Sequence, residues 1–99
     1  MATSAGAAGL SLRLAGANPS SGPFEFMYET LATSHVSCGV YDASGREVAP
    51  LLDDEQPAGR HTITWRAVDA ADRRVQPGVY MVRLTREGEV RSSRVIVVH

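Results

Sequence analysis

The sequence has no lysine, only one cysteine and no long hydrophobic run. A single cysteine excludes a disulfide within the chain. We expect Cys38, which lies in phase with Val36 and Val40, to be a small buried residue. No apolar stretch approaches the roughly 18–20 residues of a membrane-spanning helix, so insertion into a membrane is not expected. The net charge of −1 provides no positive field that would attract nucleic acid.

All ten basic residues are arginine. The planar guanidinium group of arginine binds oxyanions well, but these arginines are scattered among acidic residues. Their distribution favours the coding bias of a GC-rich genome over a phosphate-binding role. The length of 99 residues and the hydrophobic content of 43% fit one globular domain with one modest core.

Residues 1–9 consist of alanine, glycine, serine and threonine after Met1. They lack the charged and apolar regions of a secretory signal. This composition indicates a flexible linker, or an artificial start with the native chain continuing upstream. Residues 10–99 are the expected folded domain.

Apolar residues alternate with polar or small residues along most of that domain. Leu10, Leu12 and Leu14, for example, alternate with Ser11 and Arg13. A period of two is typical of strands that turn one face to the core and the other to water. The pattern predicts seven strands, near residues 10–15, 24–30, 36–42, 46–51, 60–66, 78–86 and 89–98. No stretch carries a sustained helical repeat.

Turn-forming segments separate the predicted strands. Residues 18–23 form a loop with two prolines, and Gly45 fits the left-handed position of a type I turn. Asp42 and Asp69 are expected to cap their turns through side-chain to backbone hydrogen bonds. Short connections favour antiparallel pairing. The sequence therefore predicts an all-β chain, an immunoglobulin-like antiparallel sandwich of about seven strands.

Motifs for catalysis, phosphate binding or cofactor binding are missing from the sequence. The histidines His35, His61 and His99 are scattered, so a metal site that combines them with Cys38 is not expected. The acidic residues 53–55 match no calcium-loop spacing, and we expect them to form a solvated loop. We therefore expect no catalytic residue, no cofactor and no metal, and an enzyme is the least favoured class.

Two aromatic residues have an alternative to simple burial. Trp65 is in phase with Ile63, which favours the core over stacking on a sugar ring. Tyr41 is out of phase with Val40 and is expected at the surface or under a loop. A carbohydrate-binding module is accordingly the weakest of the non-catalytic interpretations.

Five sequence blocks between residues 18 and 99 carry a family resemblance. They are Asn18-Pro19; Val40-Tyr41-Asp42 followed by Gly45, Arg46 and Val48; Pro57-Ala58-Gly59 followed by His61 and Trp65; Gly78-Val79-Tyr80; and Arg94-Val95-Ile96-Val97. On these blocks the chain resembles the C-terminal sorting domain of the bacterial type IX secretion system. It equally resembles the immunoglobulin-like domain of flagellar hook-capping proteins. The chain departs from the shared pattern at Ser20, Arg66, Ala67 and Arg94.

The sorting-domain resemblance implies a non-catalytic C-terminal module of a secreted or cell-surface protein of a Gram-negative bacterium. Its implied partner is the outer-membrane secretion machinery, reached through the periplasm, with a cargo domain on the N-terminal side. The last strand, with Arg94, Val95, Ile96, Val97 and Val98, would offer a backbone edge to that partner. The alternative is a structural or interaction module, as in the hook cap or in a spacer, whose partner is another protein.

Overall fold

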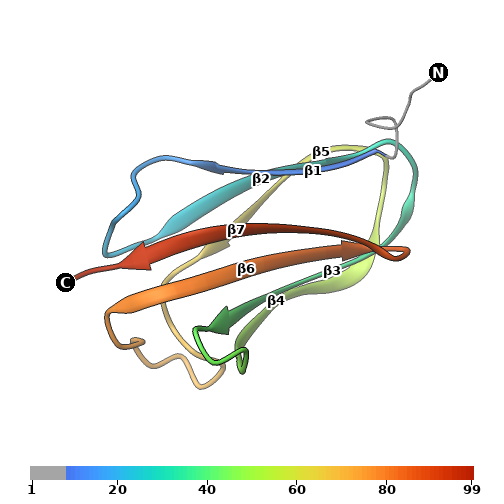
Figure 1. The fold of residues 1–99 in the computed structure, drawn as a ribbon. Coiled ribbons are helices and arrows are strands. Elements are labelled where there is room, and N and C mark those ends of the chain that lie inside the picture. The colour runs from blue at the N-terminus through green and yellow to red at the C-terminus, as the bar shows by residue number, and fades with distance from the viewer. Residues whose placement is uncertain (1–8) are drawn as a thin grey trace.

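Two antiparallel sheets pack face to face in the computed structural model, which describes residues 9–99 (Figure 1). The seven strands are β1 (Leu10–Ala15), β2 (Phe24–Thr30), β3 (Ser34–Asp42), β4 (Glu47–Gln56), β5 (Gly59–Trp65), β6 (Gly78–Arg86) and β7 (Glu89–Val97). One sheet has the order β1-β2-β5, and the other has the order β4-β3-β6-β7. The prediction of an all-β, immunoglobulin-like sandwich of seven strands is confirmed.

The period of two in the sequence becomes the two faces of each strand. In β2, Phe24, Phe26 and Tyr28 are buried while Glu25 is exposed. Each of these three residues lies opposite a residue of β5, and Phe24, for example, pairs with Trp65. Alternation therefore places the apolar side chains of both sheets in one shared layer, which is the source of most of the folding free energy.

The core is one cluster that spans both sheets. Its members are Leu10, Phe24, Phe26, Tyr28, Val36, Cys38, Val40, Ile63, Trp65, Ala67, Val75, Tyr80, Val82, Leu84, Val95 and Val97. Trp65 is 1% exposed and lies between Phe24 and Tyr80, with ring centroids 5.8 and 5.4 Å away. Its indole N–H donates to the carbonyl of Val68 at 2.8 Å. The indole is thus satisfied inside the core, as its phase in the sequence predicts.

The prediction of a solvated loop at residues 53–55 is wrong, because β4 continues to Gln56. Asp53 pairs with Ser37 of β3, and Asp54 pairs with Val36. These acidic side chains are nevertheless exposed, since β4 is the outermost strand of its sheet. An edge strand tolerates charge, and charge on an edge discourages pairing with other chains. The polarity of residues 53–55 therefore predicts their exposure correctly, but it does not predict that they belong to a strand.

The chain crosses repeatedly between the two ends of the sandwich. One end, which we call the loop end, gathers residues 16–23, 43–46, 66–77 and the C-terminal residues 98–99 (Figure 1). The predicted linker at residues 1–9 lies outside the described residues except for Gly9, whose carbonyl accepts the N–H of Leu31 at 3.1 Å. Within residues 9–99, no helix has the length and apolar character needed to cross a membrane.

Candidate functional site

The turn between β3 and β4 is organised by one carboxylate. Oδ1 of Asp42 accepts the backbone N–H of Ser44 at 3.0 Å, the Ser44 hydroxyl at 2.6 Å and the backbone N–H of Arg46 at 3.1 Å. The Ser44 hydroxyl, followed by the N–H of Arg46, holds the pKa of Asp42 below its ordinary value. Gly45 has φ 89°, a left-handed conformation that glycine adopts without strain. The predicted capping role of Asp42 is confirmed.

A second turn, between β5 and β6, repeats this construction. Oδ1 of Asp69 accepts the N–H groups of Ala71 at 2.9 Å and of Arg73 at 3.0 Å. These hydrogen bonds, chiefly that from Arg73, lower the pKa of Asp69. Asp72 has φ 66° and thus holds the position that Gly45 holds in the first turn. Both turns have the sequence Asp-Ala-x-x-Arg, a short repeat that is not apparent from the alternation of the strands.

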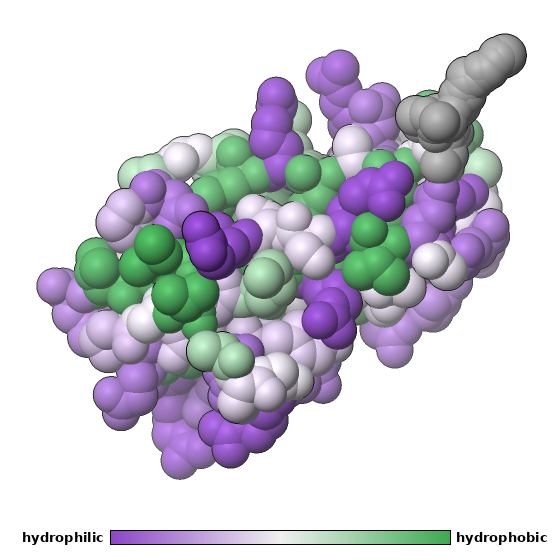
Figure 2. All heavy atoms as spheres, viewed as in Figure 1, coloured by the Kyte–Doolittle hydropathy of each residue, from purple (hydrophilic) through white to green (hydrophobic). Residues whose placement is uncertain are grey.

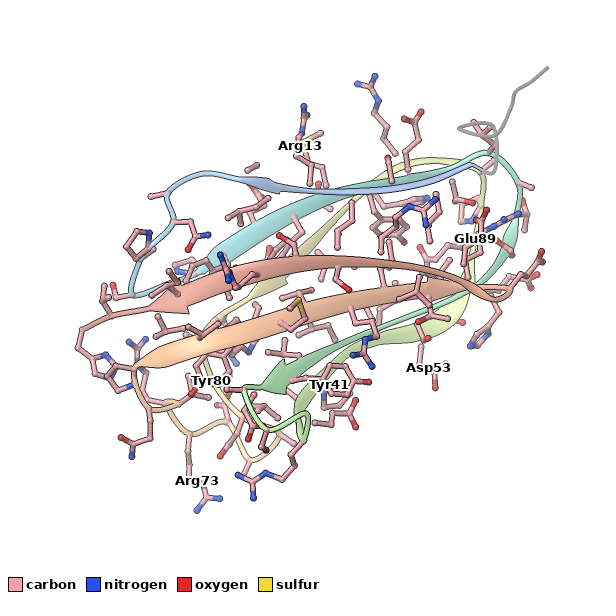
Figure 3. The ribbon with its side chains drawn as sticks, in the orientation of Figure 1. Arg13, Tyr41, Asp53, Arg73, Tyr80 and Glu89 are labelled. Atoms are coloured by element: carbon pink, nitrogen blue, oxygen red, sulfur yellow. The ribbon has the colours of Figure 1, made fainter. Side chains whose placement is uncertain are left out.

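The two turns lie side by side at the loop end. The N–H of Ala70 donates to the carbonyl of Val48 at 3.0 Å, which joins the second turn to β4. The arginine of each turn forms an ion pair with the aspartate of the same turn. Nε of Arg46 lies 3.4 Å from Asp42 Oδ2. Nε of Arg73 lies 3.4 Å from Asp69 Oδ2. The arginine side chains remain 82% and 78% exposed. Figure 3 shows the Arg73 side chain directed away from the sheets.

Between these turns is an open hollow of about 640 Å³. It is lined by Asp42, Arg46, Glu47, Val48, Asp69, Arg73, Arg74, Val75, Gln76 and Tyr80. Three arginines balance three acidic residues, so the hollow has no net charge. The hydroxyl of Tyr80 donates to the carbonyl of Gln76 at 2.6 Å, and burial raises the pKa of this phenol. Val48, Val75 and Tyr80 are the apolar and aromatic residues that line the hollow, and aromatic side chains and arginine are enriched at protein contact surfaces.

The loop between β1 and β2 closes over the edge of β7. Oδ1 of Asn18 accepts the N–H of Ile96 at 2.9 Å, and Nδ2 of Asn18 donates to the carbonyl of Arg94 at 3.1 Å. Ser20 then continues as backbone: its N–H donates to the carbonyl of Ile96 at 3.1 Å, and its carbonyl accepts the N–H of Val98 at 3.0 Å. We call residues 18–20 the edge strap.

The edge strap corrects the expected role of the last strand. Val95 and Val97 point into the core and are 0% and 1% exposed. The C=O of Arg94, both backbone groups of Ile96 and the N–H of Val98 are hydrogen-bonded to the strap. The chain's own loop therefore occupies four of the backbone groups that were expected to be open to a partner at residues 94–98.

The remaining motif residues are dispersed rather than gathered in one site. Gly59 and Gly78 are the first residues of β5 and β6. Tyr41 is half-buried on the outer face of its sheet, with the guanidinium of Arg83 4.6 Å from its ring centroid. This surface position was one of the two alternatives for Tyr41. Trp65 is enclosed and cannot stack on a sugar.

Groups that could perform chemistry do not converge in the described part of the chain. Burial raises the pKa of the Cys38 thiol to about 12, so the thiol stays protonated and weakly nucleophilic at neutral pH. His35 contacts Asp53 at 2.5 Å, and His61 contacts the carbonyl of Pro57 at 2.8 Å. Among residues 9–99, no three His, Cys, Asp or Glu side chains are grouped in a way that would hold a metal ion.

Comparison with known proteins identifies the relatives of this architecture. The family model described as the FlgD Ig-like domain matches residues 11–89. A solved structure described as that of FLGD from P. aeruginosa is similar, with a TM-score of 0.56 and 18% sequence identity. The similarity covers 91% of this chain and 75% of that chain. At this identity the likeness shows the fold. No curated protein matches the sequence.

Proposed function

The chain belongs to the FlgD Ig-like domain family, and from this premise we propose that it is a non-catalytic structural module of the flagellar hook-cap type. The observation that carries the proposal is the family match, which extends over residues 11–89 and includes strands of both sheets, up to the first residue of β7. Of the two functions implied by the sequence resemblance, this is the one that the family match favours. The proposal places the domain outside the cell, in contact with other protein subunits.

The geometry suits a module that acts by contact rather than by reaction. The close-packed core that joins the two sheets keeps the two ends of the sandwich at a fixed distance and orientation. The two Asp-capped turns fix the rim of the hollow at the loop end, where Arg46 and Arg73 are largely exposed. We propose this hollow as the surface that meets a neighbouring subunit, because it combines Tyr80 with three arginines.

Type IX sorting receives no support from the comparisons, which match the FlgD domain. The surface expected to meet the sorting machinery is the backbone edge of the last strand at residues 94–98. That edge is already bonded to Asn18 and Ser20. A sorting partner would have to displace four hydrogen bonds before it could pair with the strand. We therefore do not propose sorting as a second function.

A genetic experiment in the bacterium that carries this gene tests the proposal. The codons for residues 10–97 are deleted in frame, and hooks are counted by electron microscopy while swimming is measured in soft agar. We expect cells that lack hooks and do not swim, with both recovered when the intact gene is supplied. Normal hooks in the deletion strain would overturn the hook-cap proposal.

Point variants then test the contact surface. Arg46→Gln with Arg73→Gln removes two exposed charges at the hollow and keeps a polar, hydrogen-bonding side chain at each position. Arg60→Gln is the matched control, because Arg60 is 76% exposed and lies in β5, away from the hollow. We expect fewer hooks with the double variant and normal hooks with the control. Equal hook numbers in both would remove the hollow from the proposal.

A further inference from the structure

Sheet edges expose unpaired N–H and C=O groups that can bind another strand, and natural proteins protect them. In the four-stranded sheet the edge strands are β4 and β7. β4 is protected by its own sequence. It contains Pro50, which lacks an N–H, and the acidic residues 53–55. The two edges of one sheet can therefore be compared directly.

Beyond the exposed Arg94, the end of β7 has none of these protective residues. Residues 95–97 of β7 and the following Val98 are uncharged and β-branched, a composition that favours strand pairing. Ile96 and Val98 are 36% and 42% exposed on its outer face. Val79, which is 43% exposed, sits opposite Ile96 in β6. Figure 2 shows apolar side chains gathered over this end of the sheet.

The edge strap supplies the protection that the sequence of β7 lacks. Its four hydrogen bonds engage the C=O of Arg94, the N–H and C=O of Ile96 and the N–H of Val98. Two of the bonds come from a single side chain, that of Asn18. Beyond Asn18 the strap follows β7 as a strand would, since Ser20 forms a parallel bridge with Val97. Ser20 Oγ also accepts the N–H of Gly22 at 3.0 Å, which shapes the loop that carries the strap.

We propose that residues 18–20 form a strap that keeps the chain from pairing with a second copy of itself through β7. The partner is a second copy because the segment is self-complementary. In an antiparallel pair centred on Val97, Ile96 of one copy faces Val98 of the other. Both side chains then lie on the outer face as an apolar cross-strand pair. Like charges do not oppose each other, since residues 95–98 carry none. This inference does not rest on the hook-cap proposal.

The test is the oligomeric state of the full chain when the strap is weakened. Asn18→Ala removes two of the four hydrogen bonds, and adding Ser20→Pro removes the N–H that bonds Ile96. Mass is measured by light scattering after size exclusion and by analytical ultracentrifugation over a wide concentration range. We expect the parent to stay near 10.6 kDa and the variants to shift toward twice that mass. The association constant should rise by about tenfold for Asn18→Ala and further for the double variant.

Two controls locate any association. Ser21→Ala changes the exposed residue next to the strap, whose side chain makes no hydrogen bond in the described structure, and should leave the chain monomeric. Asn18→Ala with Val98→Lys places a charge on the pairing face and should restore the monomer. Far-ultraviolet circular dichroism verifies that each variant is folded. If the double variant does not fold, Asn18→Ala alone decides, because Asn18 is exposed.

Three results would overturn the proposal. The first is a folded Asn18→Ala variant that remains monomeric at every concentration. The second is a Ser21→Ala control that associates as strongly as Asn18→Ala. The third is association that persists with Val98→Lys, because the contact would then lie elsewhere on the molecule.

Discussion

Asn18 and Ile96 lie 78 residues apart in the sequence, yet the carboxamide oxygen of Asn18 accepts the backbone N–H of Ile96 at 2.9 Å. The amide nitrogen of the same side chain donates to the carbonyl of Arg94 at 3.1 Å. One asparagine side chain thus acts as a short piece of strand against β7. It connects the first loop of the chain to the last strand and joins the two sheets at the loop end.

Replacement of Asn18 by alanine should lower the free energy of unfolding by about 1–2 kcal/mol, because two hydrogen bonds are lost and no core contact is removed. Urea denaturation measures this change. Hydrogen exchange should accelerate at the amide of Ile96, while the amide of Val82 in the interior strand β6 remains slow. Unchanged exchange at Ile96 would show that the strap does not protect β7 in solution.

Replacement of Trp65 by alanine should cost about 3–5 kcal/mol, because a fully buried indole leaves a cavity against Phe24 and Tyr80. Trp65→Phe should cost less, since it retains part of the ring stack but leaves the carbonyl of Val68 without its donor. Both losses are measured by denaturation followed by circular dichroism, because each variant lacks the single tryptophan that a fluorescence measurement would need. A loss below about 1 kcal/mol for Trp65→Ala would contradict its place in the core.

The thiol of Cys38 should make the fold sensitive to alkaline pH. Burial raises its folded-state pKa from 9.0 to about 12. The unfolded chain therefore ionises first, and stability declines as pH rises from 9 toward 12, by up to about 1.4 kcal/mol per pH unit.

Cys38→Ala provides the comparison that isolates this effect, since Tyr28 and Tyr80 also have raised pKa values. The difference in unfolding free energy between parent and variant should change only above pH 9. At neutral pH, the thiol of the folded protein should not react with a disulfide reagent until the chain unfolds. Rapid reaction of the folded protein would contradict burial of Cys38.

The stability of the protein should decrease in acid because of the carboxylates of Asp42 and Asp69 in the two turns. Hydrogen bonds lower the folded-state pKa of Asp42 and of Asp69 below 3.8. Their stabilising effect is therefore complete above that pH and is lost as pH falls through the folded-state values. Asp42→Asn with Asp69→Asn should be less stable than the parent near neutral pH, and the gap should narrow in acid. A gap that is constant with pH would show that the carboxylate charge does not stabilise the turns.

Much of the fold follows from short-range sequence patterns, whereas the strap does not. Alternation sorts side chains between core and solvent, so Trp65 and the strands were predictable. The capping roles of Asp42 and Asp69 also depend on neighbours within four residues. A period of two does not show which strand lies beside which, and the contact between Asn18 and Ile96 spans 78 positions. The extension of β4 through Asp53 to Gln56 could not be predicted either, because an exposed edge strand and a loop can be equally polar.

The most direct test of the hook-cap proposal is the position of the protein on the cell. Antibodies raised against the purified chain, coupled to gold particles, can be imaged on growing flagella of the native bacterium. The proposal predicts gold at the distal tip of hooks that are still elongating. Gold spread over the outer membrane, with none at the hook tip, would contradict it.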